Sequence, residues 1–148
     1  MTGLIVCLAA VAAAGGAGLL YRARNGRVRA VPAGRAAGPA ASGPAEPALS
    51  AAEIGQPLGE RATLVQFSTS FCAPCRATRQ VLAEVAGMTD GVAHVEIDAE
   101  SRLDLVRRLD VRRTPTVLVL GPDGQISQRA SGQPRKADVI AAIGQVSR

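Results

Sequence analysis

The stretch of sequence that decides the fold is Thr63-Leu64-Val65-Gln66-Phe67-Ser68-Thr69-Ser70-Phe71-Cys72-Ala73-Pro74-Cys75. Its first five residues are mostly apolar and predict a buried strand. A helical pattern of apolar residues follows over 74–86, so the first cysteine stands at the junction of strand and helix. The unpaired N–H groups and the positive dipole end of that helix favour a thiolate over a thiol.

Cys72 is therefore predicted to be an activated nucleophile. Cys75 lies one turn further on the same helix face, within reach to form a disulfide, which suits reversible dithiol–disulfide exchange. Two alternatives are a structural cysteine pair without redox activity and a zinc site. Zinc needs four ligands, and apart from Cys7 in an N-terminal apolar segment the chain offers only these two thiols and a distant His94, so no metal is expected.

Charge is distributed unevenly along the 148 residues. Residues 1–48 hold five Arg and one Glu, whereas residues 49–148 hold twelve Lys and Arg against eleven Asp and Glu. The basic character therefore belongs mainly to the N-terminal part. Aromatic side chains are only Tyr21, Phe67 and Phe71, and no basic stripe interleaves with them, so nucleic-acid binding is not expected.

The segment from Leu4 to Tyr21 is uncharged and mostly apolar. Eighteen residues of helix span about 27 Å, enough for a bilayer core, so a single transmembrane helix at the cell membrane is predicted. Four Arg follow at positions 22, 24, 27 and 29, and they favour an orientation with the folded domain in the cytoplasm. The alternative orientation places the domain outside the cytoplasm.

A cleaved signal peptide is the competing interpretation of this segment. Ala12-Ala13-Ala14 contains a possible cleavage site, but positive charge follows the apolar run instead of preceding it, which favours an uncleaved anchor. Cys7 is interpreted as a small apolar membrane residue and not as a lipid attachment site, because bulky Val6 precedes it.

Composition divides the chain into three parts: residues 1–29 as the transmembrane anchor and its basic flank, 30–48 as a Pro/Ala/Gly-rich linker, and 49–148 as the folded domain. In the domain, Ser50 and Glu53 have capping-box spacing before a short helix. Strands are predicted at 63–68, 92–97, 116–120 and 125–130, and helices at 74–86, 101–109 and 136–146. In the last helix Val139, Ile140 and Ile143 are predicted to face inward.

This order of elements predicts a mixed β-sheet flanked by helices. The helix between the first two strands implies that they are parallel, and the Gly121-Pro122-Asp123-Gly124 turn implies a final antiparallel hairpin.

About two-thirds of the chain, from Leu49 to Val146, resembles thioredoxin. The resemblance rests on Phe71-Cys72-Ala73-Pro74-Cys75-Arg76, on Val111-Arg112-Arg113-Thr114-Pro115-Thr116, on Ile97-Asp98, on the Pro122-Asp123-Gly124 turn and on Gly132. Cys-x-x-Cys alone is a weak motif. Its combination with Thr-Pro-Thr, which begins 39 residues after the second cysteine, is specific.

The resemblance implies a thioredoxin-like fold and a role for each site residue. Cys72 would attack a disulfide of a client protein, and Cys75 would resolve the mixed disulfide. The Thr114–Pro115 bond would be cis. Clients would bind by short backbone pairing in a groove formed by Ala73, Pro74, Thr114, Pro115 and Gly132. No cofactor is implied, because the cysteine pair is itself the redox centre, and a reductase would supply the electrons.

Three positions depart from the family pattern. Thioredoxins usually carry a buried Asp where Gln66 stands, and that Asp helps to deprotonate the resolving cysteine. Gln66 cannot supply such a base, so it is expected to modulate the reaction. Phe71 replaces the usual Trp and Ala73 the usual Gly beside the first cysteine, and Ala73 is expected to alter the redox potential.

The sequence thus predicts a membrane-anchored, thioredoxin-like protein-disulfide reductase. One alternative is an extracytoplasmic thiol–disulfide oxidoreductase of the cytochrome-maturation kind, although Ile97–Ser101 leaves no room for the insertion common in that group. Another is a non-catalytic module that holds a client at the membrane. His94 and Asp98 are interpreted as structural residues, the latter in a turn at a strand end. The Arg107-Arg108 and Arg112-Arg113 pairs are interpreted as solvated charges.

Overall fold

The computed structural model describes residues 2–31 and 48–146. A single sheet holds five strands: β1 (Val28–Ala30), β2 (Ala62–Ser68), β3 (Val92–Asp98), β4 (Thr116–Leu120) and β5 (Ile126–Ser131). The helices are α1 (Thr2–Arg24), α2 (Ala51–Ile54), α3 (Ala73–Met88), α4 (Leu103–Arg108) and α5 (Lys136–Val146). Every helix and strand predicted within residues 50–146 is present, with boundaries that differ by at most two residues.

The strands lie in the order β1-β5-β4-β2-β3. The sequence correctly predicted that β2 and β3 would be parallel, since α3 connects them, and that β4 and β5 would form an antiparallel hairpin. The hairpin turn closes with a 2.9 Å hydrogen bond from the Gly124 N–H to the Gly121 carbonyl. Gly124 has φ +79°, a conformation that glycine adopts without strain.

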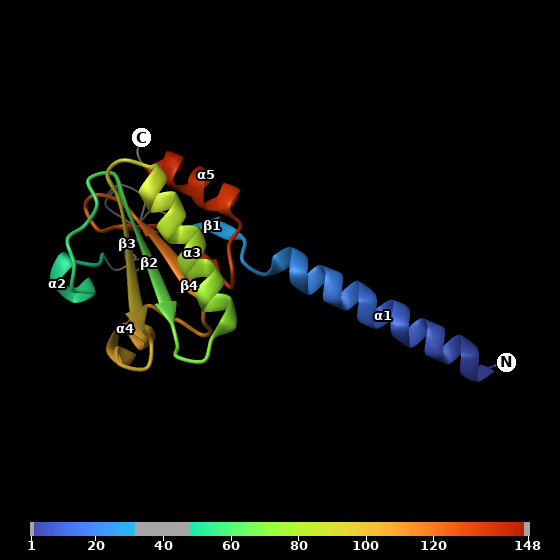
Figure 1. Ribbon diagram of the computed structural model, residues 1–148. Coiled ribbons are helices and arrows are strands. Elements are labelled where there is room, and N and C mark those ends of the chain that lie inside the picture. Colours follow the sequence, from blue (N-terminus) through green and yellow to red (C-terminus); the bar gives the residue numbers. More distant parts are fainter. Residues whose placement is uncertain (1, 32–47, 147–148) are drawn as a thin grey trace, which may run out of the picture.

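Helices cover both faces of the sheet, as Figure 1 shows. α3 and α5 pack on the face that presents Leu64, Val117 and Val119. α2 and α4 pack with the opposite face through Ile54 and Leu105. Every residue of β2 is buried, so the strand lacks the burial alternation of a half-exposed strand and carries its polar residues Thr63, Gln66 and Ser68 inside the protein. The α3 layer matters most for function, since α3 begins at the cysteine pair.

The prediction for α5 was wrong at one position. Val139, Ala142 and Ile143 are buried, whereas Ile140 is 43% exposed. The buried positions follow the i, i+3, i+4 spacing of one helix face, and Ile140, about 100° around the helix from Val139, lies outside that face. The small Ala142, three residues after Val139, takes the inward position instead.

β1 corrects the predicted division of the chain. Val28–Ala30 was assigned to the basic flank of the anchor and to the start of the linker, but it pairs antiparallel with β5 at the edge of the sheet. Val28 packs against the apolar cluster beneath α3 and α5. A three-residue strand shows no usable periodicity, and its partner lies about 100 residues later in the chain. Most of the predicted linker, residues 32–47, lies outside the described residues.

α1 extends away from the folded domain (Figure 1). Gly3–Tyr21 is long and apolar enough to cross a membrane, and none of that window is buried within the protein. Its large apolar side chains, such as Leu4, Val11 and Leu19, are exposed. Such a continuous apolar surface requires an apolar environment, for example lipid, or a further partner. A signal sequence would pass the same test of length and composition.

Candidate active site

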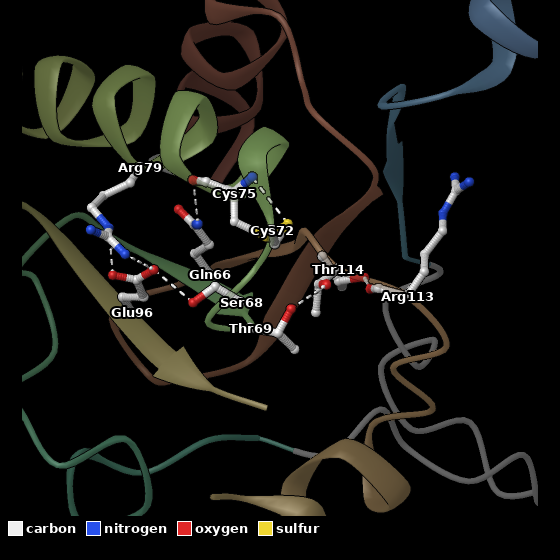
Figure 2. The surroundings of a disulfide bond; sticks show 10 residues. Gln66, Ser68, Thr69, Cys72, Cys75, Arg79, Glu96, Arg113 and Thr114 are labelled. Carbon is white, nitrogen blue, oxygen red and sulfur yellow. Dashed lines mark hydrogen bonds and ion pairs between the residues drawn. A yellow bond between two sulfur atoms is a disulfide. The ribbon is translucent and has the colours of Figure 1, made fainter. Parts of the chain in front are cut away.

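Cys72 and Cys75 form a disulfide at the start of α3, with Cα atoms 5.2 Å apart (Figure 2). Cys72 is the N-cap residue of the helix, and its Sγ accepts a 3.1 Å hydrogen bond from the Cys75 N–H. Cys72 is partly exposed, whereas Cys75 is only 1% exposed. The outer sulfur is therefore accessible to another protein, and the inner one is shielded beneath it.

The local sequence explains this placement. β2 ends at Ser68, and the Thr69–Phe71 loop leads into the helix. Pro74 lies in the first turn of α3, where its missing N–H is no loss and its fixed φ suits the helix. Phe71, directly before Cys72, is fully exposed. An exposed aromatic side chain beside the reactive sulfur can form an apolar contact with a client protein.

A second loop lies against the cysteine loop. The Thr114–Pro115 peptide bond is cis, as the resemblance implied. The Thr114 Oγ1 lies 3.3 Å from the Thr69 Oγ1, and the Cys72 N–H donates a 3.3 Å hydrogen bond to the Thr69 carbonyl. Thr69 therefore connects the two loops, as Figure 2 shows.

The structure also places the other predicted groove residues, Gly132, Ala73 and Pro74, near Pro115 and Cys72. The Gly132 N–H donates a 2.7 Å hydrogen bond to the Pro115 carbonyl. Ala73 and Pro74 are exposed beside Cys72 on the first turn of α3. The residues expected to form a groove thus come from three separate places in the chain: the first turn of α3, the loop before β4 and the loop after β5.

Gln66 lies beneath the site on β2 and is fully buried. Its Nε2 donates a 2.9 Å hydrogen bond to the Cys75 carbonyl, which ties the first turn of α3 to the sheet. Its Oε1 has no hydrogen-bond partner among the described residues. The amide supports the position of Cys75 but cannot take up a proton at neutral pH.

Sequence reasoning missed a charged cluster beside the cysteines. Glu96 on β3 accepts hydrogen bonds from Arg79 at 2.7 Å and from the Ser68 hydroxyl at 2.6 Å (Figure 2). Burial by itself would raise the pKa of the Glu96 carboxyl, but these two donors outweigh it and the pKa is lowered. Glu96 is therefore ionised at neutral pH.

The cluster lines a hollow of about 470 Å³ together with both cysteines and with Thr69, Ser70, Arg76 and Asp98. The only signal in the sequence is register: Gln66 and Glu96 are neighbours on parallel strands, and Arg79 follows Cys75 by one helical turn.

His94 and Asp98 hold the structural positions predicted for them. Burial lowers the pKa of His94, more strongly than the nearby Glu96 raises it. The Asp98 Oδ1 accepts a 3.0 Å hydrogen bond from the Glu100 N–H, which forms the turn after β3. Within residues 2–31 and 48–146, no three His, Cys, Asp or Glu side chains gather as a metal site would require.

Comparison with known proteins places the domain in a family. The family model described as Thioredoxin matches residues 51–145. Thioredoxin H5 of Oryza sativa subsp. japonica is 28% identical over 72 residues, which cover 49% of this chain and 53% of that protein. Thioredoxin C-2 of Corynebacterium nephridii is 31% identical over 87 residues, which cover 58% of this chain and 80% of that protein. The chain thus spans about half the length of some curated relatives and most of others.

Solved structures show the same fold. Chloroplastic thioredoxin z superposes with a TM-score of 0.53 and 27% identity, covering 59% of this chain and 79% of that one. A thioredoxin from Nicotiana alata gives a TM-score of 0.54 at 24% identity, covering 60% of this chain and 76% of that one. Both matches leave about two-fifths of this chain uncovered.

Proposed function

Because this chain belongs to the thioredoxin family, we propose that it is a protein-disulfide reductase that acts through Cys72 and Cys75. One observation carries the proposal: a partly exposed Cys72 caps α3 directly above a buried Cys75, next to the Thr114–Pro115 loop. An exposed nucleophile and a shielded resolving thiol are what two-step exchange requires.

In the reduced protein, the Cys72 thiolate attacks one sulfur of a client disulfide. A mixed disulfide forms between Cys72 and the client, and the other client sulfur leaves as a thiolate. The Cys75 thiolate then attacks the Cys72 sulfur, which forms the Cys72–Cys75 disulfide and releases the second client sulfur. The client gains two electrons and two protons, and a reductase returns the pair to the dithiol.

Insulin reduction by the full chain, with dithiothreitol as electron source, tests the activity. The native chain should accelerate precipitation of the insulin B chain, and Cys72→Ser should abolish the acceleration. Cys75→Ser should accumulate a mixed disulfide, which identifies natural clients by mass spectrometry. A native chain no faster than dithiothreitol alone would refute the proposal. A Cys72→Ser variant that keeps its cellular function would indicate a client-binding module.

We also propose that α1 anchors the protein in the membrane with the domain in the cytoplasm. The exposed apolar surface of α1 supports the anchor, and the four arginines at and just after its C-terminal end support this orientation. The cytoplasm maintains reduced thiols, which suits a reductase. Against the cytochrome-maturation alternative, only residues 99–102 separate β3 from α4, so the insertion common in that group is absent here.

A further inference from the structure

The membrane helix continues into the folded domain without a free linker. The Asn25 N–H donates a 2.9 Å hydrogen bond to the Tyr21 carbonyl and so continues the helical pattern of α1. The next residue, Gly26, donates its N–H to the Ser131 carbonyl at the end of β5, at 3.0 Å. Asn25 therefore makes a hydrogen bond of the helical type, and the next residue, Gly26, already makes a hydrogen bond to the end of β5.

The residues that follow strengthen this attachment. β1 pairs with β5 at three positions, and the Val31 N–H donates a 2.8 Å hydrogen bond to the Ser127 carbonyl. Gly26 is buried, and a Cβ there would lie 1.8 Å from the Gln133 carbonyl oxygen. Such close backbone packing holds residues 26–31 against the sheet edge, so α1 ends directly at that edge.

This same edge belongs to the groove. Asn25 lies against Gly132, where a Cβ would come within 2.2 Å of the Asn25 Oδ1. Gly132 in turn donates its N–H to the Pro115 carbonyl, in the loop that faces the cysteines. The path from the end of α1 to the groove therefore consists of Asn25, Gly132 and Pro115 in direct succession.

The helix length indicates how close the groove lies to a bilayer. The apolar span ends at Tyr21, and aromatic residues of this kind favour the membrane interface. Asn25 follows four residues later, about 6 Å along the helix. Each headgroup layer is about 5–8 Å thick. The Gly132 end of the groove would thus lie at the outer boundary of the headgroups.

The surface near this junction suits anionic lipid headgroups. Arg27 and Arg29 are exposed, and neither belongs to an ion pair found among the described residues. A hollow of about 580 Å³ between α1 and the domain is lined by Leu19 and Ala23 on one side and by Arg27 on the other, together with Arg135 and Asp138, which form an ion pair with each other. Basic groups next to an anchor gain attraction to an anionic membrane surface.

We propose that the substrates are disulfides of membrane proteins that lie at the bilayer surface, close to the headgroups. This inference rests on the proposed function, because it requires both the anchor and the reductase activity. A domain attached rigidly beside the bilayer meets such disulfides at high effective concentration, whereas disulfides held far above the membrane stay out of its reach.

The test uses the full chain in proteoliposomes, reduced beforehand and followed through a single turnover. Two transmembrane client peptides carry the same disulfide hairpin, one directly after the membrane span and one above a rigid 20-residue helical spacer, about 30 Å higher. The native chain should reduce the near disulfide at least about tenfold faster than the raised one, as the effective concentrations differ. Soluble insulin is measured in parallel.

A matched pair of insertions separates rigid attachment from mere anchoring. A 24-residue Gly/Ser insert between Arg24 and Asn25, which spans about 27 Å on average, should reduce the preference to about twofold or less. The same insert after Gly38 leaves the junction of α1 and β5 intact and should keep the preference. Equal rates for the near and raised clients with the native chain, or equal effects of the two inserts, would overturn the inference. A native chain that fails even with insulin would refute the proposed function instead.

Discussion

The two cysteines of the site differ in environment although only two residues separate them. Cys72 caps a helix and is partly exposed, whereas Cys75 lies inside the first turn and is almost completely buried. Thiolates are favoured at helix N-termini, and thiol reactivity also requires access. The fold therefore predicts different reactivities for two residues of the same type.

In the reduced protein, we expect iodoacetamide near neutral pH to alkylate Cys72 at least about tenfold faster than Cys75, because only Cys72 combines access with the helix N-terminus. Peptide mapping after timed quenching measures both rates in one sample. Cys7 serves as an internal reference for a thiol within α1. Faster labelling of Cys75 would mean that the roles of the two cysteines are reversed.

Gln66 illustrates how one residue changes the chemistry of the site. The side chain is buried and supports the Cys75 carbonyl through its Nε2. A carboxylic acid of the same length, once protonated, could donate to that carbonyl in place of the amide. Burial and this hydrogen bond both favour the neutral acid, so the pKa of a carboxyl at this position would lie well above its usual range.

Gln66→Glu should therefore make stability depend on pH. The folded variant would keep its proton while the unfolded chain releases it near pH 4.3, so the free energy of unfolding falls as pH rises above that value. A pKa raised by about two units corresponds to a loss of about 3 kcal/mol at pH 8.5 relative to pH 4. Urea unfolding midpoints at several pH values measure this loss of stability.

The same variant should accelerate resolution of the mixed disulfide near neutral pH, because the carboxylate can accept the proton that Cys75 loses. A gain of about tenfold corresponds to about 1.4 kcal/mol of barrier. Stopped-flow measurement of product release is the readout. Gln66→Leu is the control, which should lose stability equally at all pH values and gain no rate. An unchanged rate in Gln66→Glu would show that another group already supplies the base.

At the scale of elements, α2 is too short to be stable by itself and depends on its cap. The Ser50 Oγ accepts from the Glu53 N–H at 3.3 Å, and a Glu53 carboxylate oxygen accepts from the Ser50 N–H at 2.8 Å, which completes the capping box expected from the sequence. Arg108, at the end of α4, forms an ion pair with the same carboxylate. Glu53 thus caps α2 and also connects it to α4.

These contacts lower the pKa of Glu53 to about 2, mainly through the hydrogen bonds from Ser50. The stabilisation is therefore complete above the ordinary pKa of about 4.5 and is lost as pH falls towards 2, because the unfolded chain takes up the proton first. Glu53→Gln should cost about 0.5–1 kcal/mol at pH 7, a modest value because the side chain is partly solvated.

Chemical unfolding of the full chain in detergent, at pH 7 and pH 2.5, tests this expectation. The difference between the native chain and Glu53→Gln should be clear at pH 7 and should shrink towards zero at pH 2.5. Glu60→Gln, a change of an exposed carboxylate ten residues from Ser50, should show neither effect. A difference that grows as the solution becomes more acidic would contradict the assigned sign.

At the scale of the whole molecule, α1 leads directly into the sheet edge of the domain through Asn25 and Gly26. With the domain in the cytoplasm, alkaline phosphatase fused after Arg148 should be inactive in cells, and green fluorescent protein at the same position should fluoresce, because the arginines after α1 remain inside. Replacing Arg22, Arg24, Arg27 and Arg29 by Asn should weaken this orientation bias. An active phosphatase fusion to the native chain would place the domain outside the cytoplasm.

Much of the fold could be predicted from the sequence, because the signals that specify it are local. The apolar run of β2, the helical spacing of α3 and the Gly121–Gly124 turn each lie within a short stretch of chain. The Cys-Ala-Pro-Cys motif and Thr114-Pro115 are equally local, and the resemblance that they carry supplied the expected groove. Capping, turn formation and amphipathic packing need only neighbouring residues, so their patterns can be read along the chain.

Contacts between distant segments were decided only by the tertiary structure. β1 depends on an edge provided by β5, the Glu96–Arg79 pair depends on how β3 lies beside α3, and Asn25 meets Gly132 across more than 100 residues. None of these contacts leaves a periodic pattern in the sequence, because each joins residues from separate segments of the chain. The sequence by itself therefore determined the domain and its cysteine pair, and the three-dimensional arrangement determined that Gly132 lies beside the end of α1.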